Sequence, residues 1–191
     1  MNFPLHEQIR LENSRSLLRP LELADAEGLQ SAAFSEENIN QYTSGPLNTP
    51  ALLEAYILLA LEEKEKGIRY PFLVIDKATG AFAGSTSFAF MSDADQRLEI
   101  GFTWLGKAFK RTGLNRSNKF LMLEYAFDHL GYERVEFRAD ERNTASRRAM
   151  EAIGARYEGT LRRYKVAYDG FRRSVVFYSI LREEWWEMPR L

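Results

Sequence analysis

The 191-residue sequence contains no cysteine and only two histidines, His6 and His129. Without cysteine there is no disulfide, no thiolate-ligated zinc and no thiol nucleophile. Two histidines are too few for a histidine-rich metal site, so we expect no resident metal. The sequence also lacks an apolar run of about 20 residues and a basic-then-apolar leader. We therefore expect a soluble, cytoplasmic protein with no membrane partner.

The sequence has no excess of charge of either sign. Its 26 basic and 27 acidic residues give a formal net charge of −1, so no overall field attracts nucleic acid. A composition of 45% hydrophobic and 28% charged residues is typical of a globular protein. Because there is no repeat, low-complexity tract or Gly/Ser linker, we expect residues 1–191 to form a single domain.

Hydrophobic periodicity and turn residues predict an α/β protein with a mixed sheet. Thr49-Pro50 is a helix start, whereas Lys77–Gly80 and Asp169-Gly170 indicate hairpin turns. The expected elements are a strand at 15–22, helices at 24–34 and 51–66, strands at 70–76, 81–91 and 97–105, a helix at 114–130, a strand at 134–139, a helix at 143–153, and a hairpin of 157–168 with 171–181. The strand–helix–strand order after residue 97 predicts one parallel crossover.

The segment Lys110–Asn115 lies between an expected strand and an expected helix. A helix N-terminus has unpaired N–H groups and the positive end of the helix dipole, which favour anions. Gly113 lets the backbone approach a ligand, and four basic residues surround it: Lys107, Lys110, Arg111 and Arg116. The segment suits a diphosphate, although neither of the two common glycine-rich phosphate motifs is present. An ordinary turn with a solvated basic face explains these residues equally well.

The same segment resembles motif A of the GCN5-related N-acetyltransferase family, [QR]-x-x-G-x-[GA]. Lys110 stands at the first position and keeps the positive charge, Gly113 at the fourth, and Asn115 at the sixth, where the family usually has a smaller residue. In the family, the backbone amides of this loop bind the diphosphate of coenzyme A. The resemblance implies acetyl-coenzyme A as acyl donor, contacted here by Lys110, Arg111, Thr112, Gly113, Leu114 and Asn115.

Two further segments resemble the subfamily of ribosomal-protein alanine acetyltransferases. Residues 98–105 resemble its fourth strand, whose end pairs with the pantetheine arm, which implies contacts from Trp104 and Leu105. Residues 143–155 resemble its N-x-x-[AS] segment, which implies that Asn143 faces the same arm. The implied fold is a largely antiparallel central sheet flanked by helices, with a splayed parallel strand pair forming the cofactor cleft. Asn143 is equally well explained as a helix N-cap, and Trp104 as a packed strand aromatic.

Acetyl transfer to an amine requires a neutral amine and a proton for the leaving thiolate. Glu99, on the strand that borders the implied cleft, is the candidate base; its alternative role is a surface ion pair. The family's usual proton donor is a tyrosine seven residues beyond the asparagine, where this sequence has Met150. By resemblance, Ser146 is expected to contact the cofactor and hydrogen-bond the thiolate, with Tyr164 as an alternative donor.

The resemblance implies an N-acetyltransferase that transfers acetyl directly to a primary amine, either a protein N-terminus or a small molecule. Met150 keeps open an alternative, a catalytically inactive acyl-coenzyme A-binding module, and a partner-binding domain without a cofactor is a third hypothesis. We expect residues 35–48 and the terminal hairpin to set acceptor specificity. A homodimer is common in the family, but the sequence predicts neither the oligomeric state nor the acceptor nor the acyl-chain length.

Overall fold

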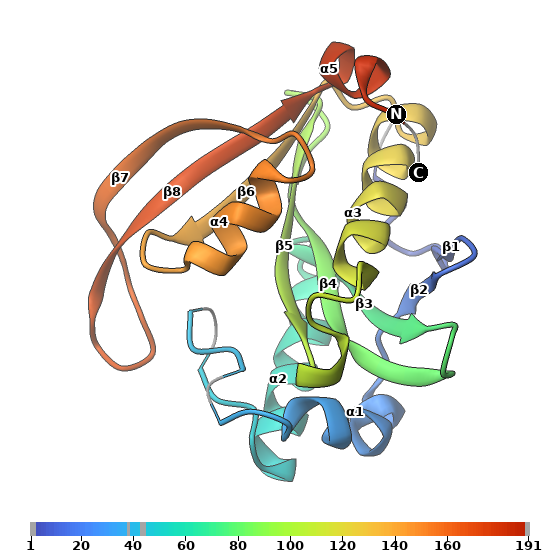
Figure 1. Cartoon of the computed structure of the whole chain (residues 1–191), viewed down its shortest axis with the longest axis vertical. Coiled ribbons are helices and arrows are strands. Elements are labelled where there is room, and N and C mark those ends of the chain that lie inside the picture. The colour runs from blue at the N-terminus through green and yellow to red at the C-terminus, as the bar shows by residue number, and fades with distance from the viewer. Residues whose placement is uncertain (1–2, 38, 43–44, 190–191) are drawn as a thin grey trace.

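The computed structural model describes residues 3–37, 39–42 and 45–189. One sheet forms its centre, with strands in the spatial order β1-β2-β3-β4-β5-β6-β8-β7 (Figure 1). The strands are β1 (Leu11–Glu12), β2 (Ser16–Pro20), β3 (Arg69–Asp76), β4 (Ala81–Ser92), β5 (Arg97–Leu105), β6 (Arg134–Asp140), β7 (Arg156–Val166) and β8 (Arg172–Leu181). The pairs along this order are antiparallel except β5 with β6, which is parallel.

Three of the helices begin at a side-chain cap or a glycine, namely Thr49, Gly113 and Asn143. Thr49 Oγ1 accepts a hydrogen bond of 3.3 Å from Leu52 N, which confirms the predicted helix start. The α-helices are α1 (Ala26–Ala33), α2 (Pro50–Glu65), α3 (Leu114–Glu124), α4 (Thr144–Glu151) and α5 (Arg182–Glu187). Short 3-10 turns precede α1 and α3, and a wider π-type turn at Tyr125–His129 extends α3. Among the described residues, none of these helices combines the length and hydrophobicity needed to span a bilayer.

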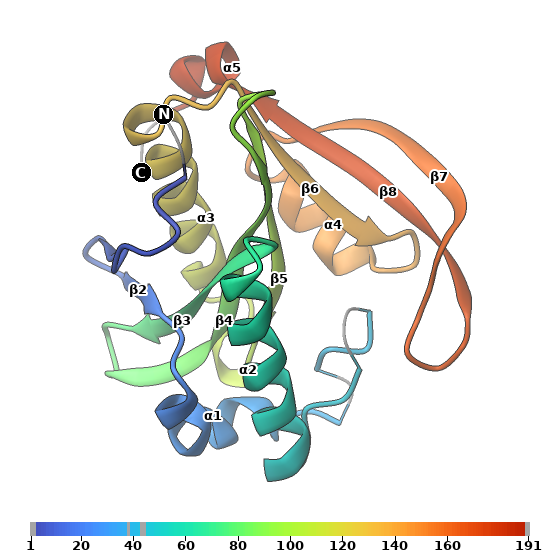
Figure 2. The same cartoon turned by 180° about the vertical axis from the view of Figure 1, so that it is seen from behind.

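The sheet separates two hydrophobic cores. Side chains alternate along a strand, so Phe72 and Val74 of β3 point into the core that contains α3, whereas Leu73 points into the core formed with α1 and α2. Figures 1 and 2 show α3 and α4 on one face of the sheet and α2 on the other. This two-faced covering explains why most of β3 and β4 is buried.

The parallel pair is the feature that positions the candidate site. β5 pairs with β6 only over Arg97–Glu99 and Arg134–Glu136. Beyond these residues the strands diverge, and β6 continues with β8 while β5 continues with β4 (Figure 1). The expected α/β fold with a splayed parallel pair in a largely antiparallel sheet is confirmed.

Several details of the fold were not predicted. The two-residue strand β1 and the C-terminal helix α5 were missed, and α3 ends as a regular α-helix at Glu124 rather than at residue 130. The terminal hairpin turns as expected, with Gly170 at φ +82°. The wide turn after α3 brings Phe127 against Trp185 of α5, with ring centres 6.0 Å apart. That contact helps to explain why a short C-terminal helix is held in place, since Trp185 is only 1% exposed.

Candidate active site

The site begins where β5 and β6 separate. The Glu99–Glu136 pair is the last rung of their ladder within the described residues. From Ile100 to Leu105, the edge of β5 that would face β6 is left without a strand partner, so its backbone groups are available to an extended ligand. Trp104 and Leu105 lie in this stretch as predicted. Both side chains are buried, Trp104 edge-on to Tyr56 with ring centres 6.1 Å apart, so their backbones rather than their side chains border the open edge.

A β-bulge interrupts β5 within the open stretch. Gly101 pairs with Ser87 and Trp104 with Ser85, so Phe102 and Thr103 together oppose the single residue Thr86. Phe102 has φ +52°, a left-handed conformation that costs energy for a residue with a bulky side chain. The bulge turns Thr103 toward α3, and its Oγ1 lies 2.7 Å from Thr86 Oγ1. The sequence contained no glycine at these two positions that would have predicted the bulge.

The predicted phosphate loop ends in an open helix N-terminus. Arg111 and Gly113 are both left-handed, with φ of +62° and +86°. The first helical hydrogen bond runs from Ser117 N to Gly113 O over 3.0 Å. The N–H groups of Asn115 and Arg116 precede that bond and have no acceptor within the described ranges. This loop geometry at a helix start suits a diphosphate.

The side chains of the loop differ in whether they are free to contact a bound anion. Thr112 Oγ1 donates to Phe109 O over 2.8 Å and accepts from Leu114 N over 3.4 Å, so it fixes the loop rather than pointing away from it. The Lys110 ammonium forms an ion pair with Glu36, on the segment that follows α1. Arg111 is exposed, so it is a cation of this loop that can reach an incoming anion.

Unsatisfied polar groups line the first half of α3. Asn115 Oδ1 is buried without a hydrogen-bond partner, as are both polar atoms of the Asn118 side chain, within the part of the chain that the structure describes. Each such group costs about 1–3 kcal/mol if it stays unpaired. Because Asn115 precedes Lys119 by four residues, the two side chains lie on one face of the helix. Polar groups therefore lead from the loop toward the point where β5 and β6 part, which fits a polar ligand arm.

Asn143 and Ser146 lie at the start of α4, which packs against β6 and β7. Asn143 Oδ1 accepts a hydrogen bond of 3.0 Å from Ser146 N, so the N-cap explanation of Asn143 is confirmed. Both residues are half-buried. Their contact with a cofactor stays a prediction, as do the ligand roles of Trp104, Leu105 and the Lys110–Asn115 loop.

Glu99 occupies the fork itself and is 6% exposed. Its Oε2 is 2.6 Å from Arg138 Nε of β6, and the Arg138 guanidinium lies between the rings of Phe90 and Phe177, at 4.8 and 5.2 Å from their centres. The other oxygen, Oε1, lies beside Gly101, where a Cβ atom would stand only 2.6 Å from it. Glu99 is thus ion-paired, as its alternative role predicted, but in a buried position rather than on the surface.

The environment of Glu99 favours a neutral carboxyl more than water does. Burial raises the pKa of Glu99 to about 7; Arg138 opposes this shift, Glu136 adds to it, and Lys119 opposes it. A carboxyl group with a pKa near neutrality exchanges protons readily at physiological pH, which is the property that a general base requires.

Lys119 is the main residue of this region that sequence reasoning missed. It is 7% exposed, in the middle of α3, and its Nζ donates to Thr103 Oγ1 over 2.8 Å. A signal was present, because Lys119 stands three residues before the buried Met122 and therefore on the sheet-facing side of the helix. Arg138 and Gly101 were also missed, since their importance depends on contacts across strands.

Met150, at the position of the family's usual proton donor, and the alternative donor Tyr164 lie in different surroundings. Met150, at the position where the resembled family has tyrosine, is 5% exposed and packs in the core with α3. Tyr164 is 49% exposed, with its ring edge-on to Phe177 at 5.8 Å between centres. Met150 therefore fills the core and supplies no proton.

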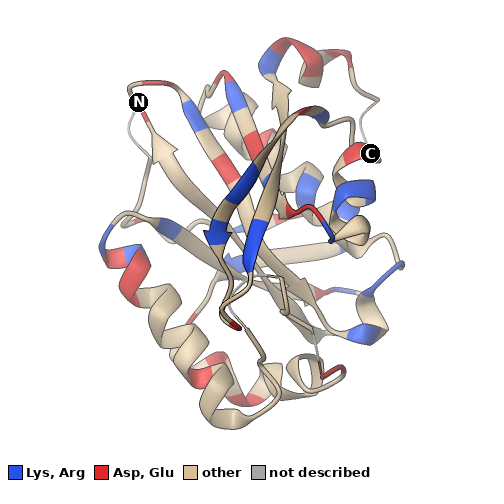
Figure 3. Cartoon of the chain, turned by 90° about the vertical axis from the view of Figure 1, so that its left-hand side faces the viewer, with Lys and Arg blue, Asp and Glu red and all other residues tan. Residues whose placement is uncertain are grey.

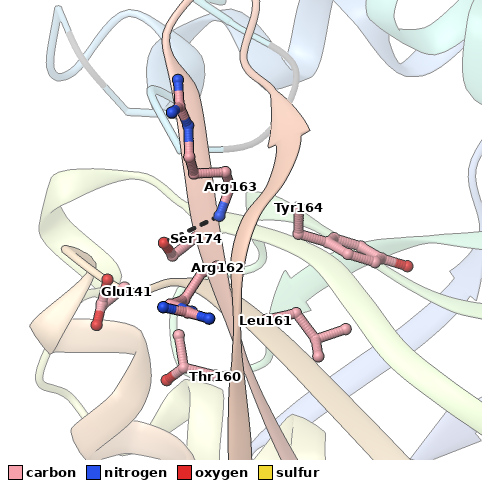
Figure 4. A pocket seen from close by; sticks show the side chains of 7 residues that line it. All are labelled: Glu141, Thr160, Leu161, Arg162, Arg163, Tyr164 and Ser174. Carbon is pink, nitrogen blue, oxygen red and sulfur yellow. Dashed lines mark hydrogen bonds between the residues drawn. The ribbon is translucent and has the colours of Figure 1, made fainter.

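A shallow pocket lies on the terminal hairpin. Its lining residues come mostly from β7, and Figure 4 shows their side chains: Glu141, Thr160, Leu161, Arg162, Arg163, Tyr164 and Ser174. Arg163 N donates to Ser174 Oγ over 3.3 Å. Lys and Arg lie on both strands of the hairpin (Figure 3). Through Tyr164, Phe177 and Arg138, this surface connects to the region of Glu99.

Comparison with known proteins decides the family. A family model described as an acetyltransferase (GNAT) domain, for GCN5-related N-acetyltransferase, matches residues 15–156. The chain belongs to the GNAT family. Solved GNAT structures agree: a GCN5-related N-acetyltransferase from Brucella melitensis superposes with a TM-score of 0.85 at 32% identity, covering 95% of this chain and 82% of that chain.

Curated relatives of this GNAT protein are named N-acetyltransferases. Protein p20 of Bacillus licheniformis, an uncharacterized N-acetyltransferase, is 26% identical over 92% of this chain and 97% of its own length. YdaF of Bacillus subtilis (strain 168), provisionally named a ribosomal N-acetyltransferase, is 31% identical over 56% of this chain and 57% of its own length. The chain is accordingly an enzyme, an N-acetyltransferase.

Proposed function

We propose that this N-acetyltransferase takes its acetyl group from acetyl-coenzyme A and binds the donor between the α3 N-terminus and the fork of β5 and β6. The observation that carries the proposal is the unpaired edge of β5 beyond Glu99, which begins at the fork and runs toward the phosphate loop. An extended pantetheine arm can pair with that edge as an added strand would. The N–H groups of Asn115 and Arg116 can then bind the diphosphate.

The chain's own residues account for the remaining requirements of the donor. Arg111 adds a positive charge at the diphosphate, whereas Asn115 and Asn118 carry buried polar atoms that a polar arm can satisfy. Ser146, in the first turn of α4, is proposed to hydrogen-bond the thioester sulfur. No metal is needed for this chemistry, and no three potential ligands among His, Cys, Asp and Glu cluster in the described part of the chain.

The proposed acceptor is a primary amine, which attacks the thioester carbon directly. Glu99 takes the proton that the amine loses, either directly or through water, since its pKa lies near 7. Arg138 holds the Glu99 carboxylate in place until the amine arrives. The C–S bond then breaks, so the products are an acetylated amine and coenzyme A.

The acceptor class that we favour is the N-terminal amine of a ribosomal protein. The name of YdaF supports it, as does the resemblance of residues 98–105 and 143–155 to the ribosomal-protein alanine acetyltransferases. The open hairpin surface offers room for a peptide rather than an enclosed cavity for a small molecule. A small-molecule amine is the competing class.

The test is an acceptor screen in which two products are measured. The enzyme is mixed with acetyl-coenzyme A and either N-terminal peptides, polyamines or other small amines; free thiol is measured by colour and the acceptor by mass spectrometry. We expect equal amounts of thiol and acetylated peptide, and Glu99→Gln should abolish most of both. Binding of acetyl-coenzyme A without turnover on any acceptor would instead favour an inactive binding module, and the absence of binding would refute the proposal.

A further inference from the structure

Lys119 is a buried cation that the proposed chemistry leaves without a role. Its Nζ can donate three hydrogen bonds, and Thr103 Oγ1 accepts one of them. No carboxylate lies within ion-pair distance of Nζ among the described residues. A methionine or leucine at this position would fill the same space without the cost of burying an ammonium group. Packing alone therefore gives no reason for a lysine here.

The ammonium group lies between the two diverging strands. Nζ is 2.8 Å from Thr103 Oγ1 of β5 and 5.9 Å from the centre of the Phe137 ring of β6. Both residues lie beyond the last paired rung of the ladder, at Glu99 and Glu136. Lys119 thus reaches from α3 into the opening of the fork, on the side of the sheet where the donor is proposed to bind.

The bulge in β5 gives the ammonium a route to the ligand. Thr103 is turned toward α3 by the bulge at Phe102, yet it remains partly exposed. Its hydroxyl accepts from Lys119 and donates its own hydrogen to Gly101 O over 3.3 Å, on the same open stretch of β5. Rotation of the hydroxyl redirects that hydrogen to a ligand group placed at this edge. The pair of side chains therefore forms a short proton path from a buried cation to the fork.

We propose that Lys119, acting with Thr103, delivers the proton that the thiolate of coenzyme A needs as the C–S bond breaks. The proposal rests on the proposed function and adds to it the proton donor that Met150 cannot be. The amine nitrogen bonds to the carbonyl carbon and loses a proton to Glu99, while sulfur leaves with the electron pair of the C–S bond. Lys119 protonates that sulfur through Thr103.

The proton count closes after each turnover. Glu99 has gained one proton and Lys119 has lost one; Glu99 then releases its proton to water and Lys119 takes one from water, which restores both groups. Burial lowers the pKa of Lys119 to about 7, with Glu99 opposing the shift, so the pKa values of the two groups are matched. The charged groups that act on this pair are Arg138, Glu136 and Lys165.

Three variants test the role of Lys119. Lys119→Met removes the charge and keeps the length, Lys119→Arg keeps a charge that cannot be given up near neutral pH, and Thr103→Val removes the relay hydroxyl. Lys66→Met, at an exposed lysine directly after α2, is the control for the same substitution outside the site. We expect kcat for Lys119→Met to fall roughly 100-fold, as for loss of a general acid, with KM for acetyl-coenzyme A within about threefold. Lys119→Arg should not restore kcat.

A second measurement is independent of turnover. The ultraviolet absorbance of the thiolate reports the ionisation of coenzyme A bound to each protein as pH is raised. A nearby ammonium should place the midpoint lower in the parent than in Lys119→Met, by at most about 3 pH units, because Lys119 itself loses its proton near pH 7. Thermal melting checks that the variant is folded. Its melting temperature should not fall, because the substitution replaces a buried ammonium by an apolar group.

The possible outcomes distinguish failure of the Lys119 proposal from failure of the proposed acetyltransferase function. Normal turnover and an unchanged thiolate midpoint in Lys119→Met would overturn the role of Lys119 while leaving the acetyltransferase function intact. A protein that binds no coenzyme A would overturn both. A large fall in kcat together with a raised thiolate midpoint, absent from Lys66→Met, would support the proposal.

Discussion

Replacing Glu99 by glutamine tests the proposed base while leaving the shape of the fork almost unchanged. With the pKa of Glu99 at about 7, roughly a tenth of the carboxyl is ionised at pH 6 and roughly nine-tenths at pH 8. If the ionised form accepts the proton of the amine, the Glu99 limb of the kcat/KM profile should rise roughly tenfold over that interval. In the parent, the loss of the Lys119 proton near pH 7 gives an overlapping falling limb, so the rise is measured in the Lys119→Met background. Glu99→Gln should lower kcat by about 10²–10⁴-fold and remove this rise, because loss of a general base typically has that effect.

The assay must separate the enzyme's titration from that of the acceptor. An alkyl amine is itself mostly protonated below pH 8, so its own ionisation would imitate the expected profile. A hydrazide or aromatic amine, which is neutral throughout the range, removes that contribution. A variant with near-parental kcat, or with the same rise between pH 6 and pH 8, would refute the assignment of Glu99 as base.

The same substitution has a consequence for stability. The pKa of Glu99 in the folded protein lies above its ordinary value of 4.5, so folding favours the protonated carboxyl. Its contribution to stability is full below pH 4.5 and is lost as pH rises through about 7, a change of about 3 kcal/mol. Urea denaturation should show that this part of the pH dependence disappears in Glu99→Gln. An identical dependence in both proteins would contradict the burial argument.

Three further substitutions test the loop, the fork and the fold. Gly113→Val should weaken acetyl-coenzyme A binding at least tenfold by calorimetry, because φ +86° is unfavourable for a β-branched residue. The control Gly170→Val, equally left-handed at φ +82° in the distal hairpin, should leave donor affinity unchanged. Equal losses of affinity in the two variants would contradict the loop's role. Gly101→Ala should displace the Glu99 carboxyl and lower kcat by roughly 10–100-fold without a matching loss of melting temperature. An unaltered kcat would show that the position of the carboxyl is unimportant. Trp185→Ala should cost about 3–5 kcal/mol in denaturant unfolding, against less than about 1 kcal/mol for the exposed Trp186→Ala, and similar losses would refute the packing of α5.

Local signals in the sequence predicted most of the fold. The Thr49-Pro50 cap and the Asp169-Gly170 turn each depend on one or two residues and their neighbours, so the pattern alone was sufficient. The strand β1 has only two residues, too short for any periodicity. Helix α5 depends on the stacking of Trp185 against Phe127, a contact between segments that are distant in the sequence.

Part of the candidate site was likewise predictable from local sequence, whereas the rest depends on contacts between distant segments. Gly113 and the basic residues around it form a local pattern, and their resemblance to motif A made the loop predictable. The bulge at Phe102 and Thr103 follows from the register between β4 and β5, which no single segment encodes. The burial of Lys119 and the Glu99–Arg138 pair likewise depend on how α3 and β6 meet at the fork.

Hydrogen exchange with and without acetyl-coenzyme A tests most directly the proposal that the donor binds along β5 and the start of α3. Mass spectrometry of peptides covering residues 101–105 and 111–117 should show slower exchange when the donor is present, because their open backbone N–H groups become hydrogen-bonded. The middle of α2, residues 55–63, on the opposite face of the sheet, should exchange at the same rate in both conditions. Protection confined to other segments, or unchanged exchange at saturating donor, would contradict the account.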